Sequence, residues 1–449
     1  MYITRILSLL GLPAMVLLAS CEEIGRIDQI DDNAPAPRSA TVKNVYAKPG
    51  GAVIRYSIPN DENILGVKAV FERNGETCES MASRFVDSLV IEGFGDTTER
   101  KAMMYSVGKN GKISEGTPVT FTPLTPPVQA VTLNLEATFG GIRIRLDGNP
   151  SNASLAVVLI QDTLLTDEGK PAAEIEWEDL YTFHTSAEKI TLNRRGLESE
   201  PKLFGVYLRD RWGNVSDTLY RKLEPFEEIK LPTDTWKLLM LPTDSYEPHE
   251  GLWNWYAPDH LWDGNYHGDM NCFASRPGPR VIWITIDLGY TAIFSRAQVF
   301  HRVYEVYSGS GLRHFQVWGS IQPNGDGLWD DSWYLLGDFI PFKPSGYNED
   351  GTPGTVTQED RDYWTNTNEF EFPQEQTDEI PYAMRPARYV RIKMLDNFDT
   401  YKGYLNADPD FSMKATYIFA EFILYGQIPD SAGSELYSMT TQNNEERCK

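Results

Sequence analysis

Residues 281–289, VIWITIDLG, contain the clearest strand signal in the chain. Apolar side chains occupy every second position of this run: Ile282, Ile284, Ile286 and Leu288. Alternate side chains of a β-strand point to the same face of a sheet, so the run predicts a strand with one face directed to a core. Similar short runs recur between clusters of Gly, Pro, Asn and Asp, and no segment has a long apolar period of 3.6 residues. The chain as a whole is therefore predicted to be all-β.

The region around this strand contains further strand-like runs in a recognisable order. They are LWDGN (residues 261–265), FSRAQVFHRV (294–303), LRHFQVWGS (312–320), WYLLGDF (333–339), ARYVRIKML (387–395) and FAEFILYG (419–426). With its early Asp-Gly-Asn and its closing Ala-Glu before Tyr-Gly, this order resembles the discoidin or coagulation-factor type C family. The resemblance implies a jelly-roll sandwich of the galactose-binding-like type over residues 233–428. An acidic insertion at residues 341–381 departs from the family, and it is open whether it covers or extends the usual ligand face.

Two regions before this domain share a pattern with each other. Each contains a strand that starts with Gly-Gly, GGAVIRYSI at residues 50–58 and GGIRIRL at 140–146, and each closes with a Gly-x-x-Ser turn. An internal repeat of about 100 residues has the size of a small β-sandwich. Residues 40–127 and 128–232 therefore each resemble a fibronectin type III-like module. Neither contains a catalytic constellation, and we interpret both as spacers.

The chain begins in the manner of an exported lipoprotein. One basic residue, Arg5, precedes an apolar run that is shorter than the roughly 20 residues of a membrane-spanning helix. This arrangement predicts a signal peptide over residues 1–20. The LASC that follows resembles the lipobox of bacterial lipoproteins, which implies diacylation of Cys21. Two acyl chains give stable anchoring; a buried helix that happens to end in cysteine is the alternative.

The residues behind Cys21 are acidic and contain proline, which is typical of a flexible tether and is expected over residues 21–39. Acidic residues in this place also resemble the signal by which Bacteroidota export lipoproteins to the outer face of the outer membrane. The resemblance implies a protein anchored by lipid and exposed at the cell surface. At the other end of the chain, a polar tail is expected over residues 429–449.

Composition excludes several classes of function. The 449 residues carry a formal net charge of −23, so the surface repels phosphate backbones and no nucleic-acid partner is expected. Beyond Cys21, the cysteines Cys78, Cys272 and Cys448 form no tight spacing, which argues against a disulfide framework or a zinc site. The sequence contains no HExxH or GxSxG motif. We therefore expect a protein that is not an enzyme.

The three parts together, a lipobox, two fibronectin-like modules and a discoidin-like domain, resemble the surface lipoproteins of Bacteroidota polysaccharide-utilisation loci. The resemblance implies capture of a polysaccharide or oligosaccharide beside an outer-membrane glycan importer. Two alternatives stay open: a protein-binding adhesin or scaffold that docks a neighbouring importer, and an unrecognised glycoside hydrolase. A hydrolase would need two carboxylates across a cleft, roughly 5–10 Å apart, and nothing in the sequence marks such a pair.

Many members of the discoidin-like family hold one structural calcium ion near the Asp-Gly motif. The residues that match the family ligands here are Asp263 and Glu421, and backbone carbonyls would complete a shell of six to eight oxygens. The alternative is that Asp263 caps a turn and Glu421 is a solvated edge charge. The nearby Trp262 and Trp283 are expected to pack against a sheet face and not to bind a ligand.

Three loops of the discoidin-like domain are predicted to form a ligand rim: residues 266–278, 300–311 and 396–411. Sugar sites combine a flat apolar surface with planar polar groups, and an arginine can donate two parallel hydrogen bonds. The candidates with these properties are His301, Arg302, Tyr304, Tyr307, Tyr266, Phe273, Asn397 and Tyr401. Each of them alone is also consistent with an ordinary exposed loop residue.

Overall fold

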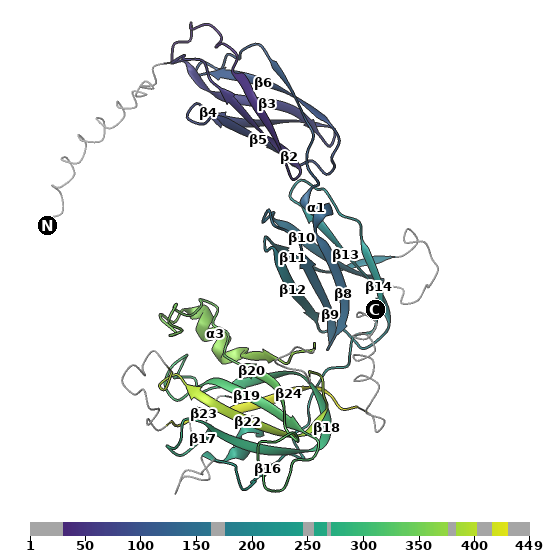
Figure 1. Cartoon of the computed structure of the whole chain (residues 1–449), viewed down its shortest axis with the longest axis vertical. Coiled ribbons are helices and arrows are strands. Elements are labelled where there is room, and N and C mark those ends of the chain that lie inside the picture. The colour runs from purple at the N-terminus through teal and green to yellow at the C-terminus, as the bar shows by residue number, and fades with distance from the viewer. Residues whose placement is uncertain are drawn as a thin grey trace, which may run out of the picture. The chain divides into compact units, whose positions relative to one another are not determined.

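The computed structural model of the protein describes residues 30–162, 176–245, 256–266, 271–375, 383–401 and 415–429. The fold is all-β, as predicted, and the sheets pack into sandwiches (Figure 1). Within the described ranges, no helix has the length and apolar character needed to cross a membrane. Cys21, the predicted lipidation site, lies outside the described residues.

The contacts between residues divide the chain into two compact units. The first comprises Met1–Leu135, Ile144–Leu192 and Lys202–Lys222, and the second comprises Glu136–Arg143, Asn193–Pro201 and Leu223–Lys449. The predicted boundaries of the individual domains stay a prediction.

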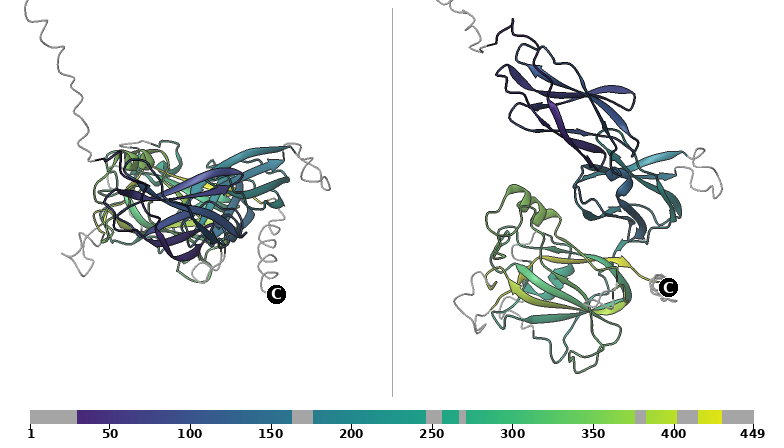
Figure 2. Two further views of the ribbon diagram at one scale, coloured as in Figure 1. Left: turned by 90° about the horizontal axis from the view of Figure 1, so that it is seen from above. Right: turned by 45° about the horizontal axis from the view of Figure 1, so that its top comes forward.

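The first sandwich has a three-stranded and a four-stranded sheet. The three-stranded sheet has the order β1 (Thr41–Lys48), β2 (Gly51–Ser57), β5 (Ser88–Glu92). The four-stranded sheet has the order β4 (Glu76–Ser83), β3 (Ile64–Arg73), β6 (Arg100–Gly108), β7 (Thr117–Phe121). Every neighbouring pair is antiparallel. Alternate residues of β2, among them Ile54 and Tyr56, are fully buried in the core between the sheets, and Figure 2 shows this sandwich in dark blue from two directions.

The next two sheets repeat this plan. A short helix, α1 (Pro127–Ala130), precedes a three-stranded sheet with the order β12 (Lys189–Arg195), β9 (Gly141–Asp147), β8 (Thr132–Thr138). The four-stranded sheet has the order β11 (Trp177–Thr185), β10 (Leu155–Asp162), β13 (Lys202–Asp210), β14 (Leu219–Leu223). Strand β10 lies between β11 and β13 and is buried along nearly its whole length.

The internal repeat that the sequence indicates is visible in atomic detail. A side chain on Gly51 would lie 2.0 Å from the carbonyl oxygen of Ile91, and one on Gly141 would lie 1.8 Å from that of Arg194. Only glycine permits such a close approach of two backbones. The two Gly-x-x-Ser turns also match: the Ser114 hydroxyl accepts the N–H of Ser106 at 2.9 Å, and the Ser216 hydroxyl accepts the N–H of Leu208 at 2.9 Å.

The C-terminal sandwich is built around one long strand, β18 (Ile282–Phe300). Its first half pairs with β22 (Ala387–Asn397), and its second half pairs with β24 (Glu421–Gln427). The register shifts between Asp287 and Ala292, where the strand passes from one layer to the other. The remaining strands of this sandwich are β15 (Ile229–Lys230), β16 (Lys237–Leu239), β17 (Phe273–Ala274), β19 (Leu312–Ser320), β20 (Tyr334–Phe339), β21 (Glu369–Glu371) and β23 (Ile418–Phe419).

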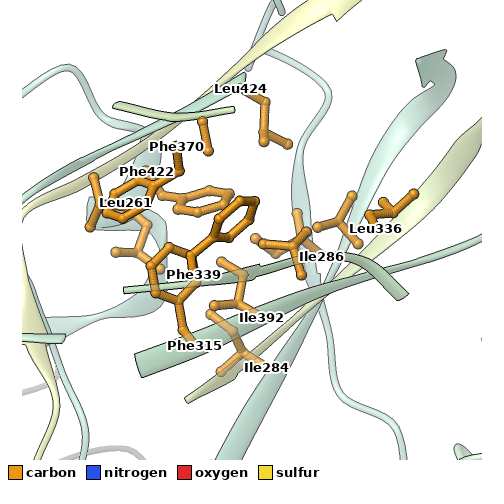
Figure 3. Close-up of a cluster of buried hydrophobic side chains, with 14 of the residues drawn as sticks. Leu261, Ile284, Ile286, Phe315, Leu336, Phe339, Phe370, Ile392, Phe422 and Leu424 are labelled. Atoms are coloured by element: carbon orange, nitrogen blue, oxygen red, sulfur yellow. The ribbon is translucent and has the colours of Figure 1, made fainter. Parts of the chain in front are cut away.

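The predicted apolar face of residues 281–289 is confirmed. Ile282, Ile284, Ile286 and Leu288 are all buried and belong to the core of the C-terminal sandwich. Figure 3 shows this core, in which side chains from both layers interdigitate: Leu261, Ile284, Ile286, Phe315, Leu336, Phe339, Phe370, Ile392, Phe422 and Leu424. Burial of aromatic and branched side chains at this density stabilises the sandwich and gives its loops a rigid base.

The acidic insertion at residues 341–381 is an integral part of this sandwich. It contains the helix α3 (Gln358–Asn366), whose first turn has a capping box formed by Thr357 and Asp360. It then adds β21 to the sheet beside β18, and Phe370 of that strand lies in the core. The insertion therefore contributes to the fold as well as to the surface.

Candidate functional site

The loop between β18 and β19 contains four of the predicted ligand-binding residues, and the structure buries two of them. His301 is 3 % exposed, and its ring stacks on Trp364 of α3 with ring centres 4.0 Å apart and an interplanar angle of 17°. Tyr307 is 1 % exposed and donates a hydrogen bond from its hydroxyl to the carbonyl oxygen of Phe342 at 2.6 Å. Both side chains therefore pack beneath the insertion.

Burial also determines the charge of His301. It lowers the pKa of the imidazole to about 3, and neither ring nitrogen has a hydrogen-bond partner among the described residues. The ring is therefore neutral at physiological pH. A neutral ring without partners acts here as a flat packing surface for Trp364.

Arg302 and Tyr304, from the same loop, reach the surface. Tyr304 is 64 % exposed. The guanidinium of Arg302 lies 3.7 Å from the carboxylate of Glu305, and its side chain is partly exposed. The backbone turns from the surface into the interior between Tyr304 and Tyr307. Tyr307 has a φ of +48°, in the left-handed region.

Two further candidates are core residues. Phe273 on β17 is fully buried and packs against Phe419 with ring centres 5.2 Å apart. Asn397 is 2 % exposed at the end of β22, where its amide donates to the carbonyl of Thr416 at 2.7 Å and its oxygen accepts the N–H of Thr400 at 2.8 Å. Asn397 therefore holds a turn together.

The last two candidates of the rim, Tyr266 and Tyr401, are partly buried and engaged. The hydroxyl of Tyr266 accepts a hydrogen bond from the Lys230 ammonium at 2.9 Å. The guanidinium of Arg313 lies over the ring of Tyr401, 3.2 Å from the ring centre, and the Tyr401 hydroxyl donates a hydrogen bond to the carbonyl of Asp350 at 2.8 Å.

The structure thus separates the predicted rim into two groups. His301, Tyr307, Phe273 and Asn397 are at most 3 % exposed, so packing is the role that their placement supports. Arg302, Tyr304, Tyr266 and Tyr401 keep exposed atoms. Trp364, which contacts both His301 and Tyr307, comes from the insertion, about 60 positions later in the chain. That long-range contact could not be read from the local sequence.

The two predicted calcium ligands are brought close together. Glu421 is 2 % exposed at the start of β24, and its two carboxylate oxygens accept the N–H of Gly264 at 3.1 and 3.2 Å. Asp263 is exposed; one of its oxygens accepts the N–H of Asn265 at 2.8 Å, and the other lies 2.7 Å from a ring nitrogen of His260. Asp263 thus caps a turn, whereas Glu421 is not a solvated edge charge.

The chemistry of Glu421 fits a cation better than that of Asp263 does. Burial raises the pKa of Glu421 to about 7, and the charge of Asp263 adds to this effect. A buried carboxylate with spare lone pairs is a ligand that calcium accepts, provided that backbone carbonyls supply most of the shell. The described part of the chain contains no group of three His, Cys, Asp or Glu residues placed to hold a metal.

One group of candidate side chains lies outside the predicted ligand rim, which comprises only loops. Trp318 on β19 and Trp329 in the following loop are partly exposed, on the opposite side of the sheet from the core. The signal was present in LRHFQVWGS, where His314, Gln316 and Trp318 alternate with core residues. A tryptophan on the outer side of a half-buried strand is an unusual choice unless something covers or binds it.

Comparison with protein families finds three matches in series along the chain. The matching models are a domain of unknown function (DUF4959) over residues 37–123, a domain of unknown function (DUF5126) over 124–234, and a domain of unknown function (DUF5000) over 262–426. The search of curated proteins found no match. The fold is an all-β series of consecutive sandwiches, and the three matching families are domains of unknown function.

Among solved structures, the chain is similar to SusE-like protein BT2857, with 26 % identity over 67 % of this chain and 99 % of that one, at a TM-score of 0.38. It is also similar to a fragment of a putative chitobiase from Bacteroides thetaiotaomicron, with 15 % identity over 45 % of this chain and 94 % of that one, at a TM-score of 0.27. A third similar structure is a fucolectin from the serum of striped bass, Morone saxatilis, with 13 % identity over 67 % and 86 %, at a TM-score of 0.27.

Proposed function

We propose that this protein is a non-catalytic glycan-binding lipoprotein of the outer membrane, and that it captures carbohydrate with the C-terminal sandwich. The observation that carries the proposal is the loop between β18 and β19. Two buried aromatic contacts, at His301 and at Tyr307, fix this loop, and Tyr304 between them is 64 % exposed. A rigid scaffold that presents an exposed aromatic ring is the usual basis of a binding loop.

The chemistry of this loop suits a sugar. The flat face of Tyr304 can pack against the C–H side of a pyranose ring, while the hydroxyl groups of the sugar need planar polar partners. Arg302 lies two residues away and supplies donors in a fixed plane, and Glu305 supplies acceptors. We therefore propose a polysaccharide or oligosaccharide as the ligand and an outer-membrane glycan importer as the neighbouring protein.

A single calcium ion at Glu421 is part of the proposal, as a structural group. It would be held by the Glu421 carboxylate with backbone carbonyls near Gly264, and it would supply charge compensation for the buried carboxylate. Asp263, the second predicted ligand, lies next to Gly264 in the same turn. This ion would fix the turn at Gly264, just after η2 (Pro258–Trp262), against β24.

Replacing Tyr304 by alanine is expected to weaken glycan binding about tenfold or more, because exposed aromatic anchors dominate weak protein–sugar contacts. The measurement is retention of the full chain in native gels that contain neutral polysaccharides. Phe85→Ala is the matched control, since Phe85 is an exposed aromatic residue of the first sandwich, 88 % accessible. Equal retention of the Tyr304 and Phe85 variants would contradict the placement of the site on this loop.

Anchoring is expected to depend on Cys21, because it is the residue that the lipobox offers for acylation. The Cys21→Ala protein should incorporate no labelled palmitate and should leave the outer-membrane fraction. A Cys78→Ala variant is the control and should behave as the wild type does. Continued labelling of the Cys21 variant would show that the anchor lies elsewhere.

A further inference from the structure

The outer side of one sheet of the C-terminal sandwich carries a row of aromatic and polar side chains. Four strands contribute to it in register: Trp283 of β18 lies opposite Lys393 of β22, Lys393 opposite Gln316 of β19, and Gln316 opposite Asp338 of β20. Adjacent strands are about 4.8 Å apart, so the row spans roughly 14 Å. We call these residues, together with Trp318, Trp329 and His314, the tryptophan face.

Three indole rings form the apolar part of the tryptophan face. Trp329 lies between the other two, with its ring centre 5.3 Å from that of Trp283 and 5.1 Å from that of Trp318, at interplanar angles of 74° and 71°. All three side chains are partly exposed. Trp283 contacts Trp329 on the outer side of the sheet and does not lie in the core, so the expectation that it packs against a sheet face and binds no ligand stays a prediction, against which the proposal below is set.

Two cations contact the ring of Trp329, which lies between the other two indoles. The Lys393 ammonium lies 4.8 Å from the centre of the Trp329 ring, and the Arg391 guanidinium lies 4.6 Å from the same centre. Arg391 is fully buried and pairs with Asp244 at 3.1 Å. Because its charge is held in place, Trp329 has a defined position although it comes from a loop.

The polar part of the tryptophan face is one connected chain of hydrogen bonds. The indole N–H of Trp318 donates to the Gln316 side-chain oxygen at 3.1 Å, and the Gln316 amide donates to Asp338 at 2.6 Å. The other oxygen of Asp338 lies 2.6 Å from a ring nitrogen of His314. An amide, a carboxylate and an imidazole thus stand beside the indoles, each with capacity for a further hydrogen bond.

We propose that the tryptophan face is a second glycan-binding surface, and that its ligand is an extended segment of a neutral polysaccharide. Indole faces suit the C–H sides of successive sugar rings, and the neighbouring planar polar groups suit their hydroxyls. The span of the row fits a chain of several sugars better than a single terminal sugar. This surface is separate from the loop that carries Tyr304, so the inference goes beyond the proposed function.

The charge around the face selects a neutral ligand. Asp326, Asp330 and Asp331 lie on the loop that carries Trp329, and Asp338 lies at the end of the row, so carboxylates outnumber the Lys393 ammonium in and around the row. These carboxylates would repel a polyanion, and the chain as a whole has a net charge of −23. An anionic glycan such as a polyuronate would therefore bind far less than a neutral one.

The test uses the purified full chain and a panel of neutral polysaccharides, namely galactomannan, xyloglucan, soluble starch and mixed-linkage glucan, with polygalacturonate as the anionic comparator. Hexasaccharides of any neutral polymer that retards the chain in native gels are then titrated by calorimetry. We expect two hexasaccharides per wild-type chain, one per Trp329→Ala chain, one per Tyr304→Ala chain, and none for the double variant. Polygalacturonate should not retard the chain.

The outcomes separate this inference from the proposed function. One hexasaccharide per wild-type chain, lost in Tyr304→Ala and kept in Trp329→Ala, would overturn the second surface and leave the proposed function intact. No binding by the wild type to any neutral polymer would overturn both. A dimer in sedimentation that Trp329→Ala converts to a monomer would show that the face joins two copies, and would also overturn the inference.

A second variant guards against loss of fold. Gln316→Ala removes one partly exposed amide, which is also the acceptor of the Trp318 indole N–H, but it keeps all three indole side chains, so the sandwich should unfold at the wild-type temperature. It should nevertheless weaken binding to the face about threefold to tenfold, because the hydroxyls of the sugar lose a planar partner. Unchanged binding by both Gln316→Ala and a folded Trp329→Ala protein would exclude the face.

Discussion

The Asp360→Ala protein is expected to lose about 3–5 kcal/mol of the unfolding free energy of its C-terminal sandwich, because the substitution leaves a buried ammonium without its counter-charge. The Asp360 carboxylate lies 3.0 Å from the Lys343 ammonium, and the two side chains are 0 % and 1 % exposed. Asp360 also accepts the N–H groups of Ser345 at 2.9 Å and of Thr357 at 2.8 Å. One substitution therefore removes an ion pair, a turn and a helix cap together.

The pKa of Asp360 supports this expected loss of unfolding free energy. Burial opposes its ionisation, yet the hydrogen bonds from Thr357, Ser345 and Lys343 hold the pKa of the carboxyl well below its usual range. The carboxylate therefore stays charged in the folded protein, and its contribution is present above the ordinary pKa of an aspartate and is lost as the pH falls below it.

Thermal unfolding of the purified chain measures the effect. Asp362→Ala is the matched control, because Asp362 lies on the exposed side of the same helix and should change the unfolding free energy by no more than about 0.5 kcal/mol. A loss below about 1 kcal/mol for Asp360→Ala would show that the insertion does not unfold with the sandwich. In that case its burial of His301 and Tyr307 would be a local contact only.

Much of the architecture follows from the sequence, because the signals that specify it are local. The alternation of Ile282, Ile284 and Ile286 predicts a half-buried strand, and the structure buries all three. The Gly-x-x-Ser turns predict a repeat, and Ser114 and Ser216 make the same hydrogen bond in both sandwiches. A period of two residues is a property of the strand itself, so it does not depend on what the rest of the chain does.

The site was less predictable, because exposure depends on distant residues. His301 and Tyr307 have the composition of a binding loop, but Trp364 covers both, and nothing near residue 301 announces the helix that carries it. The tryptophan face was not predicted, although part of its signal is local. Trp318 could have been assigned to the outer side of β19 by the same alternation that predicts the core, whereas the position of Trp329 beside it depends on a loop.

Glu421→Gln is expected to stabilise the metal-free protein at pH 8 and to have little effect at pH 4, below both pKa values of the carboxyl. Burial, with the nearby charge of Asp263, raises the pKa of Glu421 from 4.5 to about 7 in the folded state. The folded protein therefore holds a proton between these two values that the unfolded chain releases. Because the unfolded state binds fewer protons there, stability falls as the pH rises from about 4.5 to about 7, and then levels off.

The size of the effect follows from the same difference in pKa. A change from 4.5 to about 7 corresponds to about 3 kcal/mol at a pH above both values, since each pKa unit is worth about 1.4 kcal/mol. Glutamine keeps the shape of the side chain and its acceptor for the N–H of Gly264, but it carries no charge to bury. In a domain of this size, 3 kcal/mol raises the melting temperature by roughly 6–12 °C.

Calcium reverses the sign of this prediction, and that reversal separates a metal site from a buried acid. In excess chelator, Glu421→Gln should melt above the wild type at pH 8, while the exposed Glu359→Gln control should match the wild type. Added calcium should then raise the melting temperature of the wild type and of the control, but not that of Glu421→Gln, because a ligand stabilises only the state that binds it.

Equal responses of all three proteins to calcium would leave Glu421 as a buried acid without a metal. Equal melting of wild type and Glu421→Gln in chelator at pH 8 would mean that the carboxylate is compensated within the protein, by the N–H of Gly264 and by the Lys230 ammonium, which both lower its pKa.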